Sequence, residues 1–320
     1  MKTILISGAS SIVGLGILKS LRMSDKKLYL IGTTCFDDTV VPAFCDVFVK
    51  APLTNEHGYI SWLMTTIEKY KVDMIIPGID ADMYKWTENI DKVSKGNHHV
   101  LINRPELISL CEDKWLFYQK MKASDVTYSI PSSMSNNFEE LKAKFGLPLL
   151  LKPRCGFGSK GISKVLDKKT FLKHCDKIGE ILMVQPFIGD DKEEYTTSAF
   201  CDGNGGYFAC MTLKRKLSKD GYTEKGEVVE IEGMEEAISE YCKVLKPVGP
   251  TNFQFRVANG ELRLLEINPR ISSATSIRSS FGYNESEMAI DFFLENKKPV
   301  QPLIKQGKAV RYVEDYIFYK

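Results

Sequence analysis

The sequence feature that most restricts the fold is a tight turn between two stretches in which apolar and polar residues alternate. The stretch 251–280 reads TNFQFRVANGELRLLEINPRISSATSIRSS, with Asn259-Gly260 between FQFRV and ELRLLEIN. Asn-Gly favours a two-residue hairpin turn, because both residues tolerate the positive φ angles that this turn needs. We therefore expect the two runs to pair as antiparallel strands.

The predicted hairpin carries a polar face. Side chains alternate along a strand, so Glu266 and Asn268 share one face, and Gln254 of the partner strand reaches the same face. A carboxylate and two amide oxygens form a hard ligand set, suited to Mg²⁺ that also holds nucleotide phosphates. Arg270, just past the strand, adds a planar cation for a phosphate. The competing interpretation is an ordinary solvated strand face.

A glycine-rich stretch lies upstream, at 149–165, LLLKPRCGFGSKGISKV. An apolar strand delivers Lys152, and the loop Gly156–Gly161 can turn its backbone amides toward phosphate oxygens, with Lys160 adding charge. The spacing is not that of a P-loop, and the following ISKV reads as a strand, so we expect a hairpin flap. Many surface turns share this composition.

A proline-bent connection follows at 181–200, ILMVQPFIGDDKEEYTTSAF. The crossing at Gln185–Ile188 can offer free backbone groups to an adenine edge, and a following carboxylate can accept ribose hydroxyls. Taken alone, this segment reads better as an ordinary connection between domains.

The opening stretch SGASSIVGLG, Ser7–Gly16, predicts a strand, a turn and a helix. It departs from the dinucleotide fingerprint, because Ser10 and Val13 occupy the second and third glycine positions. The next strand, LYLIG, is not followed by an acid for the ribose until Asp37. A structural role for this loop is favoured, and a nicotinamide-dependent oxidoreductase stays open as a second interpretation.

The pattern of apolar runs changes along the chain. Up to about residue 110, short apolar strands alternate with helical segments, which predicts a parallel sheet covered by helices. After residue 190 the strands are longer and alternate in polarity, which predicts an antiparallel sheet. The fold class is therefore a mixture of α/β and α+β, divided into 1–110, 111–190 and 191–320.

Composition restricts the partners and the compartment. The chain has 320 residues and a net charge of +2, which gives no electrostatic footprint for nucleic acid or a membrane. Eight cysteines occur without a C-x-x-C pair, and four histidines lack metal-binding spacing. With no apolar run at the N-terminus long enough for a signal peptide or a membrane span, we expect a reducing cytoplasm. A homo-oligomer is neither indicated nor excluded.

Together these stretches resemble the ATP-grasp superfamily, most closely the synthetase domains of the carbamoyl phosphate synthetase large subunit. The resemblance covers nearly the whole chain, and its specific element is E-x-N-P-R in register with the upstream glutamine. It implies two α+β subdomains that clasp ATP, preceded by a Rossmann-like pre-ATP-grasp domain.

The resemblance also implies a set of site residues. Lys114 corresponds to the basic residue near the adenine and α-phosphate, and Lys152 to the second basic residue. Glu194 corresponds to the ribose-binding glutamate, although a loop one residue longer than the family pattern leaves Glu193 as a substitute. The remaining nucleotide contacts are the flap and the hinge, namely Gly156, Gly158, Ser159, Lys160, Gly161, Gln185, Pro186, Phe187 and Ile188.

Two metal ions, Mg²⁺ with Mn²⁺ as an alternative, are implied at Gln254, Glu266 and Asn268, with Glu266 bridging. Lys152, Glu266 and Arg270 are the implied catalytic groups. For the acceptor substrate the sequence offers only basic side chains, Lys214, Arg215, Lys216 and Arg278, of which the first three read equally well as a solvated strand end.

The implied activity is a ligase that uses ATP to convert a carboxylate into an acyl phosphate, which an amine or similar nucleophile then attacks. Its partners are small molecules. With one ATP-grasp unit, and neither a glutaminase domain nor a second synthetase half, a stand-alone ligase fits better than synthesis of carbamoyl phosphate. The oxidoreductase and an ATP-binding sensor or scaffold without turnover are the alternatives.

Overall fold

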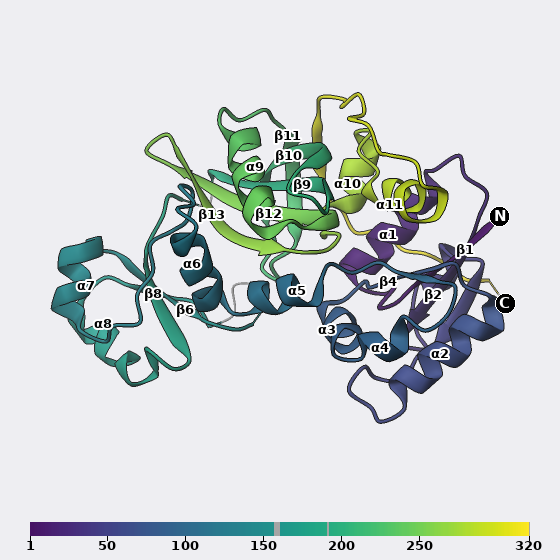
Figure 1. Cartoon of the computed structure of the whole chain (residues 1–320), viewed down its shortest axis with the longest axis horizontal. Coiled ribbons are helices and arrows are strands. Elements are labelled where there is room, and N and C mark those ends of the chain that lie inside the picture. Colours follow the sequence, from purple (N-terminus) through teal and green to yellow (C-terminus); the bar gives the residue numbers. More distant parts are fainter. Residues whose placement is uncertain (157–160, 191, 320) are drawn as a thin grey trace.

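The computed structural model describes residues 1–156, 161–190 and 192–319, and within them the chain forms three β-sheets. In Figure 1 the sheet nearest the termini and the smallest sheet lie at opposite ends of the molecule, with the largest sheet between them. Among the described residues, no helix combines the length and the apolar character that a membrane span requires.

The N-terminal sheet is parallel, as predicted, with the order β3-β2-β1-β4-β5. Its central strands are buried on both faces because they consist of short apolar runs. The strands are β1 (Lys2–Ile6), β2 (Leu28–Thr34), β3 (Val47–Lys50), β4 (Met74–Ile76) and β5 (His99–Val100). The helices are α1 (Ile12–Arg22), α2 (Tyr59–Tyr70), α3 (Asp80–Glu88) and α4 (Ile90–Val93), with the 3₁₀ turn η1 (Val41–Ala43).

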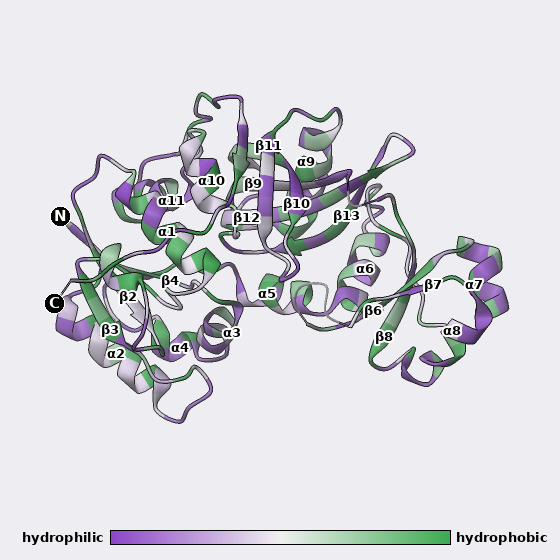
Figure 2. Ribbon diagram, turned by 180° about the vertical axis from the view of Figure 1, so that it is seen from behind, coloured by the Kyte–Doolittle hydropathy of each residue, from purple (hydrophilic) through white to green (hydrophobic). Residues whose placement is uncertain are grey.

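The small sheet forms a lobe with its own core. Its strands β6 (Leu149–Pro153), β7 (Ser163–Val165) and β8 (Leu182–Pro186) pair antiparallel in the order β7-β6-β8. The lobe also contains α7 (Phe138–Phe145), α8 (Lys168–Leu172) and η2 (Cys175–Lys177). Leu149 and Leu151 pack with Phe138 and Phe171 beneath the helices. In Figure 2, β8 is mostly hydrophobic and the outer helix α7 mostly hydrophilic.

The central sheet is antiparallel, as predicted for the region after residue 190, with the order β13-β12-β9-β10-β11-β14. Its strands are β9 (Glu194–Asp202), β10 (Tyr207–Leu217), β11 (Thr223–Val228), β12 (Val248–Ala258), β13 (Glu261–Asn268) and β14 (Lys308–Val310). Helix α9 (Met234–Leu245) packs on one face, while α10 (Thr275–Ser280) and α11 (Glu285–Glu295) pack toward the other.

Two helices connect the N-terminal sheet to the small lobe, α5 (Pro105–Glu112) and α6 (Lys114–Ala123). The three sheets lie within the segments 1–110, 111–190 and 191–320. Helix α6, however, lies in the second segment but packs on the core of the third, where Met121 joins Tyr241 and Phe253.

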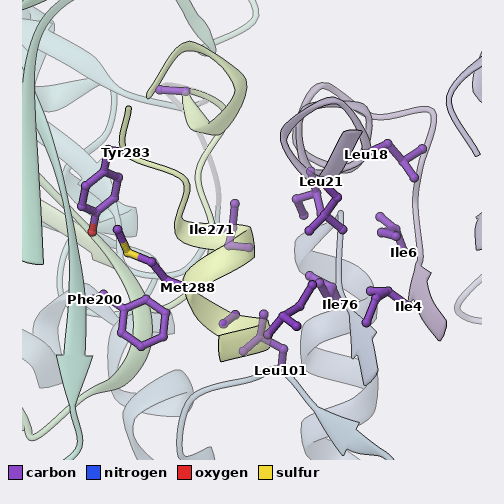
Figure 3. Packing of buried hydrophobic residues seen from close by; sticks show 14 of the residues in the cluster. Ile4, Ile6, Leu18, Leu21, Ile76, Leu101, Phe200, Ile271, Tyr283 and Met288 are labelled. Atoms are coloured by element: carbon purple, nitrogen blue, oxygen red, sulfur yellow. The ribbon is translucent and has the colours of Figure 1, made fainter. Parts of the chain in front are cut away.

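The N-terminal and central sheets share one hydrophobic core. Figure 3 shows Ile6 and Leu21 of the N-terminal sheet and its first helix on one side, and Ile271 and Met288 of the C-terminal region on the other. Since apolar contact is continuous across this boundary, the first hundred residues are fixed relative to the hairpin β12–β13.

Candidate functional site

The hairpin β12–β13 has the geometry that Asn-Gly predicts. Asn259 and Gly260 form the turn with φ angles of 53° and 79°. Gln254 pairs with Glu266, and Asn252 pairs with Asn268, so the predicted metal ligands lie on one face of the sheet. This confirms the predicted pairing and the predicted polar face.

A β-bulge lies next to these residues. Gln254 is paired with Glu266 but Phe255 with Leu264, so Leu265 is the extra residue of β13. The backbone carbonyl of Leu265 accepts a hydrogen bond from Lys152 Nζ at 3.0 Å. The bulge therefore joins the hairpin to strand β6 of the small lobe.

Lys152 is nearly buried, with 7% of its surface exposed. Burial lowers the pKa of its ammonium group to about 8, while the negative charge of Glu266 opposes this shift and the positive charge of Lys114 adds to it. Arg256 and Glu194 also act on Lys152, so five charged groups from both sides of the cleft interact at one place.

A pocket open to solvent lies between α6, the small lobe and β13, with about 430 Å³ of empty space when the open solvent at its mouth is included. Its walls are mostly apolar, and its polar groups include Lys114, Lys152, Gln185 and Glu266. Apolar walls with a few placed polar groups are typical of small-molecule sites. The sequence-predicted residues from three separate stretches thus line one pocket.

The described part of the predicted flap lies beside α6. Asp113 caps α6 and forms an ion pair with Arg154, and Lys114 Nζ donates to the backbone oxygen of Gly156 at 2.9 Å. Gly161 ends the loop before β7. The predicted contacts Gly158, Ser159 and Lys160 lie outside the described residues.

The predicted hinge is held at both ends. Gln185 Nε2 donates to Ser132 Oγ at 2.9 Å, and the Phe187 amide donates to the oxygen of Pro148 at 3.0 Å. The carbonyl of Ile188 accepts from Arg256 Nη1 at 3.3 Å. Pro186 is the last residue of β8, so these residues form the crossing between the small lobe and the central sheet.

Glu194 lies on the cleft face of β9, opposite Arg256 of β12. Its side chain is 6% exposed and forms ion pairs with Arg215 at 2.8 Å and Arg256 at 2.9 Å. Glu193 points to the other face, where it accepts from Tyr195 Oη and from Lys214 Nζ. Of the two acids considered for the ribose, Glu194 therefore shares the cleft with the predicted metal ligands.

The basic strand Lys214–Lys216 is divided by its alternation. Arg215 faces the cleft, and its Nη2 donates to Gln254 Oε1 at 2.6 Å. Lys214 pairs with Glu193 on the opposite face, and Lys216 is an exposed residue near Glu224. Only Arg215 among these three lies beside the candidate site.

Arg278 does not face the cleft. Its side chain is fully buried, with Nη1 3.7 Å from Glu285 Oε1 and hydrogen bonds to Ser272, Thr196 and Asn252. This position in the core argues against the expected contact with an acceptor substrate.

Arg270, the last residue of E-x-N-P-R, reaches across to helix α3 beside the N-terminal sheet. Its Nε lies 2.7 Å from Asp80 Oδ1, and its Nη2 lies 3.4 Å from Asn268 Oδ1. Sequence reasoning missed both Asp80 and Arg256. The alternation that placed Gln254 on the cleft face could have found Arg256, since it lies two residues further along the same strand.

The comparisons agree with this geometry. Residues 180–316 match the family described as "ATP-grasp in the biosynthetic pathway with Ter operon". The chain contains an ATP-grasp domain. The matched residues include the whole central sheet, with the hairpin β12–β13 and its bulge. The match confirms the predicted family.

Relatives extend the similarity toward the N-terminus. The chain is 26% identical over 285 residues to the carbamoyl phosphate synthase large chain of Methanothrix thermoacetophila, which covers 82% of this chain and 26% of the relative. It is 24% identical over 298 residues to the formate-dependent phosphoribosylglycinamide formyltransferase of Prochlorococcus marinus, covering 84% and 69%. The chain thus spans about a quarter of the carbamoyl phosphate synthase chain that it matches.

Solved structures share the fold over almost the whole chain. N5-carboxyaminoimidazole synthetase from Staphylococcus aureus, complexed with ADP, superposes with a TM-score of 0.72 at 16% identity, covering 95% of this chain and 80% of that one. Biotin carboxylase from Campylobacter jejuni, in complex with β-γ-ATP, gives 0.75 at 18% identity, covering 96% and 74%. The ATP-grasp fold with a preceding parallel sheet is therefore confirmed.

Proposed function

We propose that the protein is an ATP- and Mg²⁺-dependent ligase that activates a carboxylate as an acyl phosphate for attack by an amine. The observation that carries this proposal is that Lys152 and Glu266 line the same pocket. Beside them lie Gln254, Asn268 and Arg270. These are the cations and the oxygen ligands that a nucleoside triphosphate and its metal need, and they come from two sheets that enclose the pocket.

The chemistry of the donor set fits a magnesium ion. Glu266, Gln254 and Asn268 supply oxygens on one face, and Asn268 Nδ2 lies 3.3 Å from Glu266 Oε1. The described residues contain no group of three or more His, Cys, Asp or Glu placed for a metal, so this site relies on amide oxygens and on phosphate. We propose two ions with Glu266 bridging, and Mn²⁺ as a substitute. Bound there, the metal would neutralise charge on the transferred phosphoryl group.

The chain's own residues bind and orient the nucleotide in this proposal. Lys114 and Lys152 bind phosphates, and the apolar pocket wall with the crossing Gln185–Ile188 receives the base. Glu194 is the ribose ligand, in competition with the guanidinium groups of Arg215 and Arg256 that hold it here. Arg270 stabilises the charge that develops on the transferred group, which is the main task of the protein in phosphoryl transfer.

The substrates follow the chemistry of the relatives, whose names refer to formyl, carbamoyl and carboxyamino products. We propose a small carboxylate and a small amine. No acceptor contact is assigned to Lys214 or Arg278, given their positions away from the cleft. All eight cysteines are free, in keeping with the reducing cytoplasm proposed from their spacing.

Nucleotide binding tests the proposal first. Isothermal titration with Mg²⁺ and AMP-PNP, the non-hydrolysable analogue of ATP, should show one site, and Glu266→Gln should weaken it. NADH and NADPH are the control ligands, because the alternative oxidoreductase would bind one of them. Binding of either control ligand without binding of AMP-PNP would overturn the proposal.

Phosphate release then tests turnover. The wild type is incubated with ATP, Mg²⁺ and a matrix of small carboxylates and amines, and we expect phosphate release that depends on one carboxylate and one amine together. Arg270→Ala should lose roughly a hundredfold or more in that rate. Binding of ATP without release across the whole matrix would instead favour the sensor or scaffold.

A further inference from the structure

The arginine of E-x-N-P-R is held by the N-terminal domain. Arg270 Nε lies 2.7 Å from Asp80 Oδ1, and Nη2 lies 3.2 Å from Asp80 Oδ2. The two residues are 190 positions apart. Both side chains are mostly buried, with 16% of Arg270 and 22% of Asp80 exposed. A bidentate, mostly buried ion pair of this kind fixes the orientation of the guanidinium group as well as balancing its charge.

The ion pair with Asp80 uses one edge of the guanidinium group. Asp80 takes the side edge formed by Nε and Nη2. Nη2 also reaches Asn268 Oδ1 at 3.4 Å, so this nitrogen lies beside a predicted metal ligand, while Nη1 donates to the Ile271 carbonyl at 3.2 Å. Since the guanidinium group is planar and rigid, fixing its side edge fixes the direction of the end edge.

The position of Asp80 is itself fixed by close packing at the ends of the parallel strands. Asp80 is the first residue of α3, two residues after Gly78, which lies in the turn that follows β4. A Cβ on Gly78 would lie 2.3 Å from the oxygen of Ser7 and 2.7 Å from the Cα of Gly14. Ser11 Oγ donates to the Gly78 carbonyl at 2.7 Å. The opening loop thus holds the segment that carries Asp80.

We propose that Asp80 is a positioning residue that aims Arg270 at the γ-phosphate, so that the N-terminal domain completes the site of phosphoryl transfer. This inference rests on the proposed function. Asp80 contacts neither nucleotide nor metal in this scheme and acts only through Arg270. The glycines and serines of the opening loop gain a role as the support of Asp80.

The test compares affinities for AMP-PNP and ADP in the presence of Mg²⁺, because only AMP-PNP carries the γ-phosphate. Titration calorimetry gives both dissociation constants for the wild type, Asp80→Asn, Arg270→Gln and the double variant. We expect the wild type to prefer AMP-PNP, and Arg270→Gln to lose about tenfold of that preference. Asp80→Asn should lose most of the same preference, and the double variant should lose no more than Arg270→Gln.

Two further variants separate positioning from folding. Asp82 lies on the same helix but points into the N-terminal core, where it accepts from Thr54 and from Tyr59 Oη. Asp82→Asn should lower the thermal midpoint and keep the wild-type preference. Asp80→Glu restores the carboxylate and should recover part of the preference.

Wild-type preference in Asp80→Asn, or additive losses in the double variant, would overturn this inference alone. An increased preference in Asp80→Asn would also overturn it, because Asp80 would then restrain Arg270 away from phosphate. A wild type that binds neither nucleotide would overturn the proposed function and this inference with it.

Discussion

Lys152 Nζ lies 3.0 Å from the backbone oxygen of Leu265, the extra residue of the β-bulge in β13. The contact joins the small lobe to the central sheet at the predicted phosphate site. Because a buried ammonium group is costly unless it has acceptors or counter-charges, the pKa of Lys152 falls to about 8. A phosphate brought to this lysine would favour the charged form.

Nucleotide affinity should therefore depend on pH above neutrality. Burial depresses the pKa of Lys152, so the group is charged below about pH 8 and loses its proton as the pH rises through that value. We expect affinity for Mg²⁺ and AMP-PNP to fall between pH 7 and pH 9.5, with uptake of a proton on binding near pH 8. Titration calorimetry in buffers of different ionisation enthalpy measures both. In Lys152→Arg, which stays charged, the decline should vanish, and a decline that persists there would contradict this origin.

The two neighbouring acids at the start of β9 should differ sharply in their effect on stability. Glu194→Gln removes the counter-charge of the buried Arg215 and the mostly buried Arg256, and should cost about 3–5 kcal/mol of unfolding free energy. Glu193→Gln breaks a half-exposed pair with Lys214 and should cost less than about 1 kcal/mol. Urea denaturation of both variants checks this. Equal losses would contradict the assigned faces.

Arg278 and Glu285 should behave as one buried unit. Either Arg278→Gln or Glu285→Gln leaves a charge in the core and should cost about 3–5 kcal/mol. The double variant should lose less unfolding free energy than the two single variants together. We expect a coupling energy of about 1–3 kcal/mol from urea denaturation of the three variants. If Arg278→Gln kept full stability and instead lost use of the acceptor, the substrate role expected from the sequence would be restored.

Gly78 should not tolerate a methyl group. In Gly78→Ala the new Cβ meets the oxygen of Ser7 and the Cα of Gly14 at distances that force the backbone apart, so we expect a loss of about 1–3 kcal/mol. Gly226→Ala is the control, since its nearest heavy atom would lie at 3.5 Å, an ordinary contact. Thermal unfolding compares the two. Equal thermal midpoints for the two variants would show that the opening loop is less tightly packed than these distances indicate.

Local signals predicted the parts of the site that depend on neighbours in the chain. The Asn-Gly turn and the period of two placed Gln254, Glu266 and Asn268 on one face because turn chemistry and strand alternation act over a few residues. The same period of two places Lys214 and Arg215 on opposite faces of their strand. Applied to that strand, it would have predicted that only one of the two side chains faces the cleft.

Long-range partners were not predictable in this way. The pairing of Arg270 with Asp80 depends on how two sheets pack, and no pattern near either residue indicates it. The burial of Arg278 has the same origin, since its acceptors come from β9 and β12. The packing of α6 on the central sheet follows from its apolar side meeting Tyr241 and Phe253, which lie more than a hundred residues further on.

The core shared by the two ends of the chain also sets the order of events during synthesis. The apolar side of α1 that carries Leu21 is covered by α10 and α11, which include Ile277 and Met288. At about 5–20 residues per second, the ribosome adds these helices roughly 13 to 50 s after α1. Until then this apolar side of α1 lacks its cover. We therefore expect overproduction of this protein to benefit from a supply of chaperones.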